Sequence, residues 1–113
     1  MSSELFVHLF HILFVGSLFI YIGIKQKTMA PWVFKMLALL GIFVIIFHLY
    51  KAHINFTEKR ALWVNLFHIL IIGPLLIAVG LHGEKAPRYL FELIFMLGFA
   101  VVGYHGYYLA IGH

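Results

Sequence analysis

Four long apolar stretches, separated by short polar links, dominate the chain. They cover residues 5–24, 31–50, 61–81 and 89–111. Each has about the ~20 residues that a helix needs to cross a hydrocarbon layer roughly 30 Å thick. The pattern predicts an all-α membrane protein, a bundle of four transmembrane helices that forms one membrane domain over residues 1–113.

The links hold most of the charged residues and the helix-breaking residues. Because the links are short, neighbouring helices should be antiparallel, and four crossings should leave both termini on the same side. The face with the first and third links has five basic residues: Lys25, Lys27, Lys35, Lys85 and Arg88. The face with the second link has three: Lys51, Lys59 and Arg60. Since basic residues favour the cytoplasmic side, we expect a multi-pass protein with both termini on the non-cytoplasmic side.

The chain contains an internal repeat with an offset of 57 residues. The 20 residues from Leu5 match the 20 residues from Leu62 at 11 identical positions. The same offset aligns the second helices, where His48 meets His105 and Gly41 meets Gly98. The repeats therefore span about 5–53 and 62–110, and we expect each of them to form a helical hairpin. Because each copy has two crossings, the copies should be parallel and related by an axis along the membrane normal.

The composition narrows the possible chemistry and partners. Hydrophobic residues make up 64% of the chain and charged residues 11%, and there is no cysteine. Disulfides and thiolate metal sites are thereby excluded. The net charge of +4 is spread over the links without a cluster. This distribution favours the lipid bilayer and its anionic headgroups as the partner and argues against nucleic acid.

Four histidines that the repeat aligns in two pairs lie within apolar stretches, where a polar side chain is costly and suggests function. They are His11, His48, His68 and His105. By their distances from the helix midpoints, all four should lie in one half of the membrane, with the two pairs differing in depth by about 5 Å. The sequence therefore predicts one buried layer of four imidazoles.

Haem b is the first candidate for a ligand of this layer. His48 and His105 would be the axial ligands, since two imidazoles facing each other across a bundle can bind one haem iron. Gly41 and Gly98, seven positions before them, share their helical stripe and would leave room for the macrocycle. His11 and His68 would then support the site. Electron transfer is the implied task.

A metal ion is the second candidate. His11, His48, His68 and His105 together approximate a tetrahedron suited to Zn or Cu. His8 shares the face of His11 and could add a ligand, whereas its repeat equivalent, Asn65, cannot replace an imidazole.

Other classes of protein stay open at this point. The histidines can serve as hydrogen-bonding groups between the helices of a structural or interaction protein, or line a small channel. Whether the chain is an enzyme is also open. Four glycines form seams for a neighbouring helix, through which a homo-oligomer could assemble: Gly16, Gly23, Gly73 and Gly80. Pro74, aligned with Ser17, should distort the third helix locally.

Overall fold

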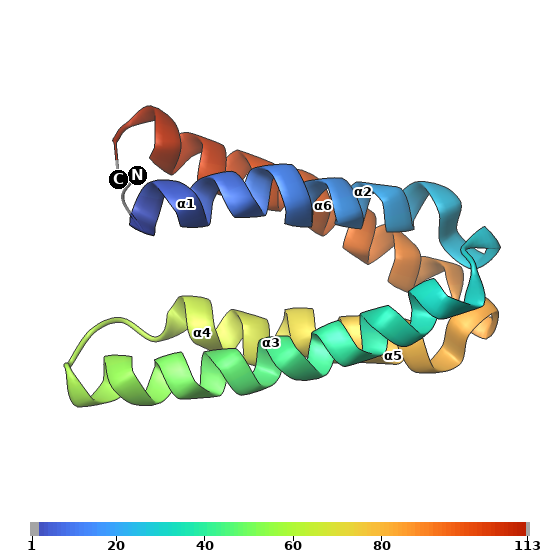
Figure 1. Cartoon of the computed structure of the whole chain (residues 1–113), viewed down its shortest axis with the longest axis horizontal. Coiled ribbons are helices and arrows are strands. Elements are labelled where there is room, and N and C mark those ends of the chain that lie inside the picture. The colour runs from blue at the N-terminus through green and yellow to red at the C-terminus, as the bar shows by residue number, and fades with distance from the viewer. Residues whose placement is uncertain (1–2, 113) are drawn as a thin grey trace. The chain divides into compact units, whose positions relative to one another are not determined.

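The computed structural model describes residues 3–112, which form four long helical spans and no strand (Figure 1). The spans are Ser3–Thr28, Pro31–Thr57, Trp63–Lys85 and Arg88–Ala110, and each is long and apolar enough to cross a membrane. The predicted all-α fold class with four membrane-spanning helices is therefore confirmed. Residues 1, 2 and 113 of the predicted membrane domain 1–113 lie outside the described residues.

Two of the spans change helix type along their length. The first consists of α1 (Ser3–Phe10), the π-helix η1 (His11–Val15), α2 (Gly16–Lys25) and the 3-10 turn η2 (Gln26–Thr28). The third consists of α4 (Trp63–Phe67), the π-helix η3 (His68–Ile72), α5 (Gly73–His82) and the 3-10 turn η4 (Gly83–Lys85). The second and fourth spans are the uninterrupted helices α3 (Pro31–Thr57) and α6 (Arg88–Ala110).

The first and third links end and restart the helices in the same way. Gln26 and Gly83, which the repeat aligns, both follow the last residue of an α-helix with positive φ, at 50° and 59°. This conformation ends a helix and suits glycine better than glutamine. A proline then lies at or next to the start of the following helix. Pro31 is the first residue of α3, whereas Pro87 is the residue before α6 and is in an extended conformation.

The spans pack as two separate antiparallel pairs. In the first unit, the span Ser3–Thr28 lies along α6, and in the second unit α3 lies along the span Trp63–Lys85 (Figure 1). Each unit therefore combines one helix from each sequence repeat and does not coincide with a repeat. The sequence analysis placed the two spans of each repeat in one hairpin and did not predict this pairing.

Glycines set the close approach of the helices within each unit. A side chain on Gly23 would collide with Phe95, and one on Gly80 would lie 2.5 Å from the backbone nitrogen of Ala38. Such small residues let membrane helices approach closely. The seams predicted at Gly16, Gly23, Gly73 and Gly80 thus pack against the other helix of the same unit, which confirms their packing role. Assembly of a homo-oligomer through them stays a prediction.

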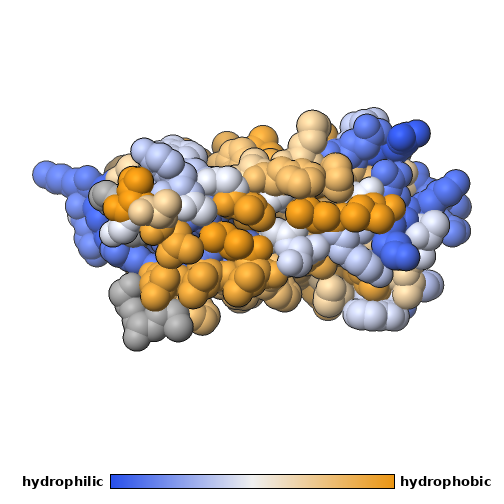
Figure 2. Space-filling view, turned by 90° about the horizontal axis from the view of Figure 1, so that it is seen from above, coloured by the Kyte–Doolittle hydropathy of each residue, from blue (hydrophilic) through white to orange (hydrophobic). Residues whose placement is uncertain are grey.

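Large apolar side chains cover the outer surfaces of the spans. Leu13, Leu39 and Leu70 each expose about two thirds of their surface, at 68%, 68% and 66%. Figure 2 shows hydrophobic side chains along the helices and hydrophilic ones towards the helix ends. In water such a surface would be unfavourable, whereas in a bilayer it faces lipid. The chain is accordingly a multi-pass integral membrane protein.

Candidate functional site

Each unit contains one pair of stacked imidazole rings. In the first unit, the ring centroids of His11 and His105 lie 4.3 Å apart with an interplanar angle of 21°. In the second unit, the rings of His48 and His68 lie 4.0 Å apart at 13°. The repeat aligns His11 with His68 and His105 with His48, so the two units make the same contact.

The first histidine of each pair begins a π-helix. The backbone N–H of Gly16 donates to the carbonyl of His11, and that of Gly73 donates to the carbonyl of His68. π-helical turns are rare and occur often at functional sites. Pro74 follows only the second of these π-helices, so the proline is not needed for the widened turn.

The tautomers of His11 and His68 follow from their hydrogen bonds. The Nδ1 of His11 donates to the backbone carbonyl of Val7, and the Nδ1 of His68 to that of Val64, both over 2.7 Å. A carbonyl oxygen can only accept, so Nδ1 carries the proton in both rings. In a neutral imidazole the lone pair is then on Nε2.

The other histidine of each pair bonds to a side chain. The Nδ1 of His48 donates to the Oδ1 of Asn65 over 2.9 Å. The Nδ1 of His105 lies 2.9 Å from the Nδ1 of His8, so one of these two nitrogens donates to the other. Because the repeat aligns His8 with Asn65, an imidazole and an amide serve at the same place in the two units.

The sequence analysis considered His8 and Asn65 only as metal ligands and missed this role. The signal was present in the sequence: both residues stand three positions before the first histidine of their pair, on its helical face. Asn65 is 5% exposed and is the one buried polar side chain among residues 3–112. A buried amide is costly unless it is hydrogen-bonded, which indicates a specific role.

The four paired histidines themselves are half-buried. The prediction that they are buried is therefore wrong. A pair of helices encloses an imidazole only where the helices meet, so the stacked face is covered and the remainder is not. Each ring also meets, edge on, the aromatic residue that precedes it in the chain, namely Phe10, Phe47, Phe67 and Tyr104. Each of the four rings thus has an aromatic side chain as its neighbour along the chain.

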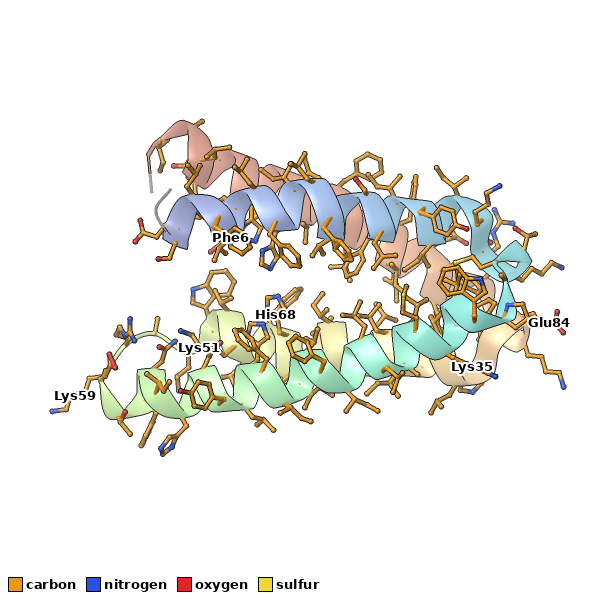
Figure 3. All side chains as sticks on the ribbon, viewed as in Figure 1. Phe6, Lys35, Lys51, Lys59, His68 and Glu84 are labelled. Atoms are coloured by element: carbon orange, nitrogen blue, oxygen red, sulfur yellow. The ribbon has the colours of Figure 1, made fainter. Side chains whose placement is uncertain are left out.

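Within the second unit, His68 lies in the half of the span nearer Lys51 and Lys59 and away from Lys35 and Glu84 (Figure 3). His48 lies at the same depth because the two rings stack. The first unit brings His11 and His105 together in the same way. A single layer that joins both pairs, and with it a contact of His48 with His105, stays a prediction.

Gly41 and Gly98 lie in helix contacts. A Cβ on Gly41 would be 2.7 Å from the carbonyl oxygen of Gly73, and a Cβ on Gly98 would be 3.0 Å from the Cβ of Phe19. Both glycines therefore pack against the other helix of their own unit. Their predicted role as the lining of a cofactor slot gains no support from these contacts and stays a prediction from the sequence.

Within the described part of the chain, no group of three or more His, Cys, Asp or Glu side chains is arranged to hold a metal ion. Comparison with known proteins gives no match: no family model, curated protein or solved structure is similar to the chain.

Proposed function

We propose that this integral membrane protein binds haem b, with His48 and His105 as the ligands, and transfers electrons in the membrane. One observation carries the proposal. In both units a histidine that is hydrogen-bonded through Nδ1 stacks on a second imidazole, and the two arrangements are equivalent in the repeat. Metal-ligating histidines commonly use their second ring nitrogen in such a bond, which orients the ring and fixes the tautomer.

The stacking favours one ligand per pair. The lone pair of an imidazole nitrogen lies in the plane of the ring, and rings inclined by only 13° and 21° have nearly parallel planes. Two such rings cannot both direct a lone pair at one iron. His11 and His68, tied to their own backbone, suit the supporting role, and His48 and His105 suit the role of ligand.

Bound haem would supply one-electron chemistry, and His48 and His105 would be the residues that hold it. The residues of the chain would orient the ligands and exclude water. Phe47 and Tyr104 lie edge on to the two proposed ligands.

A Zn or Cu ion held by all four imidazoles is less well supported. Such a site needs both rings of a pair to point at the same ion, and near-parallel stacking opposes this. The stacked arrangement therefore favours haem over a four-histidine ion.

A structural membrane protein is the second candidate, favoured by a different observation. The same hydrogen bonds that would orient ligands also join the two helices of each unit: His48 with Asn65 joins α3 to α4, and His105 with His8 joins α6 to α1. Contacts of this kind between membrane helices contribute about 0.6 to 2 kcal/mol. They stabilise the fold whether or not a cofactor binds.

The visible spectrum of the purified protein, with its iron, zinc and copper content, distinguishes these candidates. The proposal predicts a Soret band and stoichiometric iron. A colourless protein that holds stoichiometric zinc or copper would support the metal ion. A protein without chromophore or metal would support the structural role.

A further inference from the structure

We infer that Asn65 and His8 are equivalent positioning residues, which hold His48 and His105 in the Nδ1–H tautomer so that Nε2 can act as a ligand. The inference rests on the proposed function for its purpose, but the tautomers can be measured without any cofactor. It assigns a role to two side chains that stand at matching repeat positions and make matching contacts.

In the second unit, the hydrogen-bond partner of His48 is an amide oxygen, which fixes the direction of the bond. The Oδ1 of an amide can only accept a hydrogen bond, and it lies 2.9 Å from the Nδ1 of His48. His48 must therefore carry its proton on Nδ1, which places the lone pair on Nε2 while the ring is neutral. Asn65 is almost fully buried, at 5% exposed, so water competes little for this bond.

The first unit achieves the same geometry with an imidazole. The Nδ1 of His8 can accept a hydrogen bond from the Nδ1–H of His105 if His8 carries its own proton on Nε2. The ring of His8 is also stacked on Tyr108, with centroids 6.3 Å apart and an interplanar angle of 9°. This contact holds the ring of His8 in place on α1.

The equivalence predicts which substitutions are tolerated. Asparagine at position 8 offers the acceptor that already serves at position 65, so His8→Asn should keep the tautomer of His105. Asn65→His should likewise keep that of His48. Alanine offers no acceptor at either position, so Asn65→Ala and His8→Ala should release the tautomer of the facing histidine.

The test uses the chain of 113 residues, with its histidines labelled with ¹⁵N, in detergent micelles and without cofactor. Nitrogen chemical shifts distinguish a protonated ring nitrogen from one that carries a lone pair, and so report the tautomer of each histidine. Asn55→Ala is the matched control, because the side chain of Asn55 bonds only to the backbone of Ala61 in the outer link among the contacts the structure gives it.

We expect His48 to be protonated on Nδ1 in the unaltered protein and in Asn55→Ala, and to lose this preference in Asn65→Ala. Haem retention should fall about 10- to 100-fold in Asn65→Ala and His8→Ala, as it does when the hydrogen-bonding partner of a metal ligand is removed, and stay within a few-fold in His8→Asn. If Asn65→Ala fails to fold, the comparison of His8→Ala with His8→Asn decides the question in the first unit.

An unchanged tautomer of His48 in Asn65→Ala, or equal behaviour of His8→Asn and His8→Ala, would overturn the inference. A protein that carries no haem but shows the expected tautomers would refute the proposed function and leave the positioning contacts standing. If the protein binds haem but the tautomers of His48 and His105 do not respond to these substitutions, the proposed function stands and the inference about the positioning residues is refuted.

Discussion

His11 stacks on His105 although the two residues stand near opposite ends of the chain, with ring centroids 4.3 Å apart. The contact joins a helix of the first repeat to a helix of the second. His48 and His68 make the equivalent contact with the roles of the repeats exchanged. Helix pairing in this protein therefore crosses the boundary between the repeats.

This pairing predicts specific disulfide cross-links, for which the absence of native cysteine is convenient. The double variant Gly16→Cys with Val102→Cys should cross-link on oxidation, because a Cβ on Gly16 would lie 2.7 Å from a methyl carbon of Val102. The control keeps Val102→Cys and carries its second cysteine at the exposed Leu13 in place of Gly16; it should give little cross-linked product. Gel mobility after oxidation measures both, and equal yields would contradict the pairing.

The close helix contacts at the glycines predict that replacing such a glycine with a larger residue lowers the stability of the protein. Gly80→Leu should destabilise the second unit by about 1 to 3 kcal/mol or more, because the side chain would meet the backbone of α3 at Ala38 and Phe34. Gly103→Leu is the matched control, since a Cβ there meets nothing within 4 Å. Unfolding in a titration of denaturing detergent measures the difference. Similar midpoints for the two variants would show that Gly80 does not set the helix contact.

The helical spans were readable from the sequence because they depend on local properties: about 20 apolar residues in a row predict a span. The sequence also put His48 and His68 in the same half of the membrane, and their rings stack. The choice of helix partner was not readable, since every span is apolar and carries equivalent glycines. The π-helices at His11 and His68 were equally hidden, because no proline or other breaker precedes either of them.

The site illustrates the same limit at the level of single residues. His48 and His105 could be selected from their repeat alignment, but their hydrogen-bonding partners depend on which helices meet. Asn65 was set aside because an amide is a poor ligand for a transition metal. Its value as a hydrogen-bond acceptor for His48 became visible only once α3 and α4 were known to pack together.

The membrane topology gives a separate prediction. From four crossings and short links we expect the links around Lys27 and Phe56 to lie on opposite sides of the membrane, and the excess of basic residues favours the cytoplasm for Lys27. Single cysteines at positions 27 and 56 should react with a membrane-impermeant thiol reagent from opposite sides of intact cells or vesicles. Labelling of both from one side would contradict the topology.

The role of Pro74 can be tested through its repeat equivalent. Pro74→Ser introduces the residue found at position 17, where the same π-helix forms without a proline. The hydrogen bond from His68 to Val64 should therefore persist, and the ¹⁵N signals of His68 should report an unchanged Nδ1–H tautomer. A change of tautomer in Pro74→Ser would mean that the proline shapes the second histidine pair after all.

The central claim is that one imidazole of each stacked pair binds haem iron while the other supports it. Reduced-minus-oxidised visible spectra of membranes containing His48→Ala, His105→Ala, His11→Ala and His68→Ala test it most directly, with the exposed His53→Ala as the control. The account predicts a low-spin b-type spectrum in the unaltered protein and in His53→Ala, loss or conversion to high spin in the first two variants, and a weakened but low-spin spectrum in the other two. No haem signal in the unaltered protein, or an undiminished low-spin spectrum without His48 or His105, would contradict it.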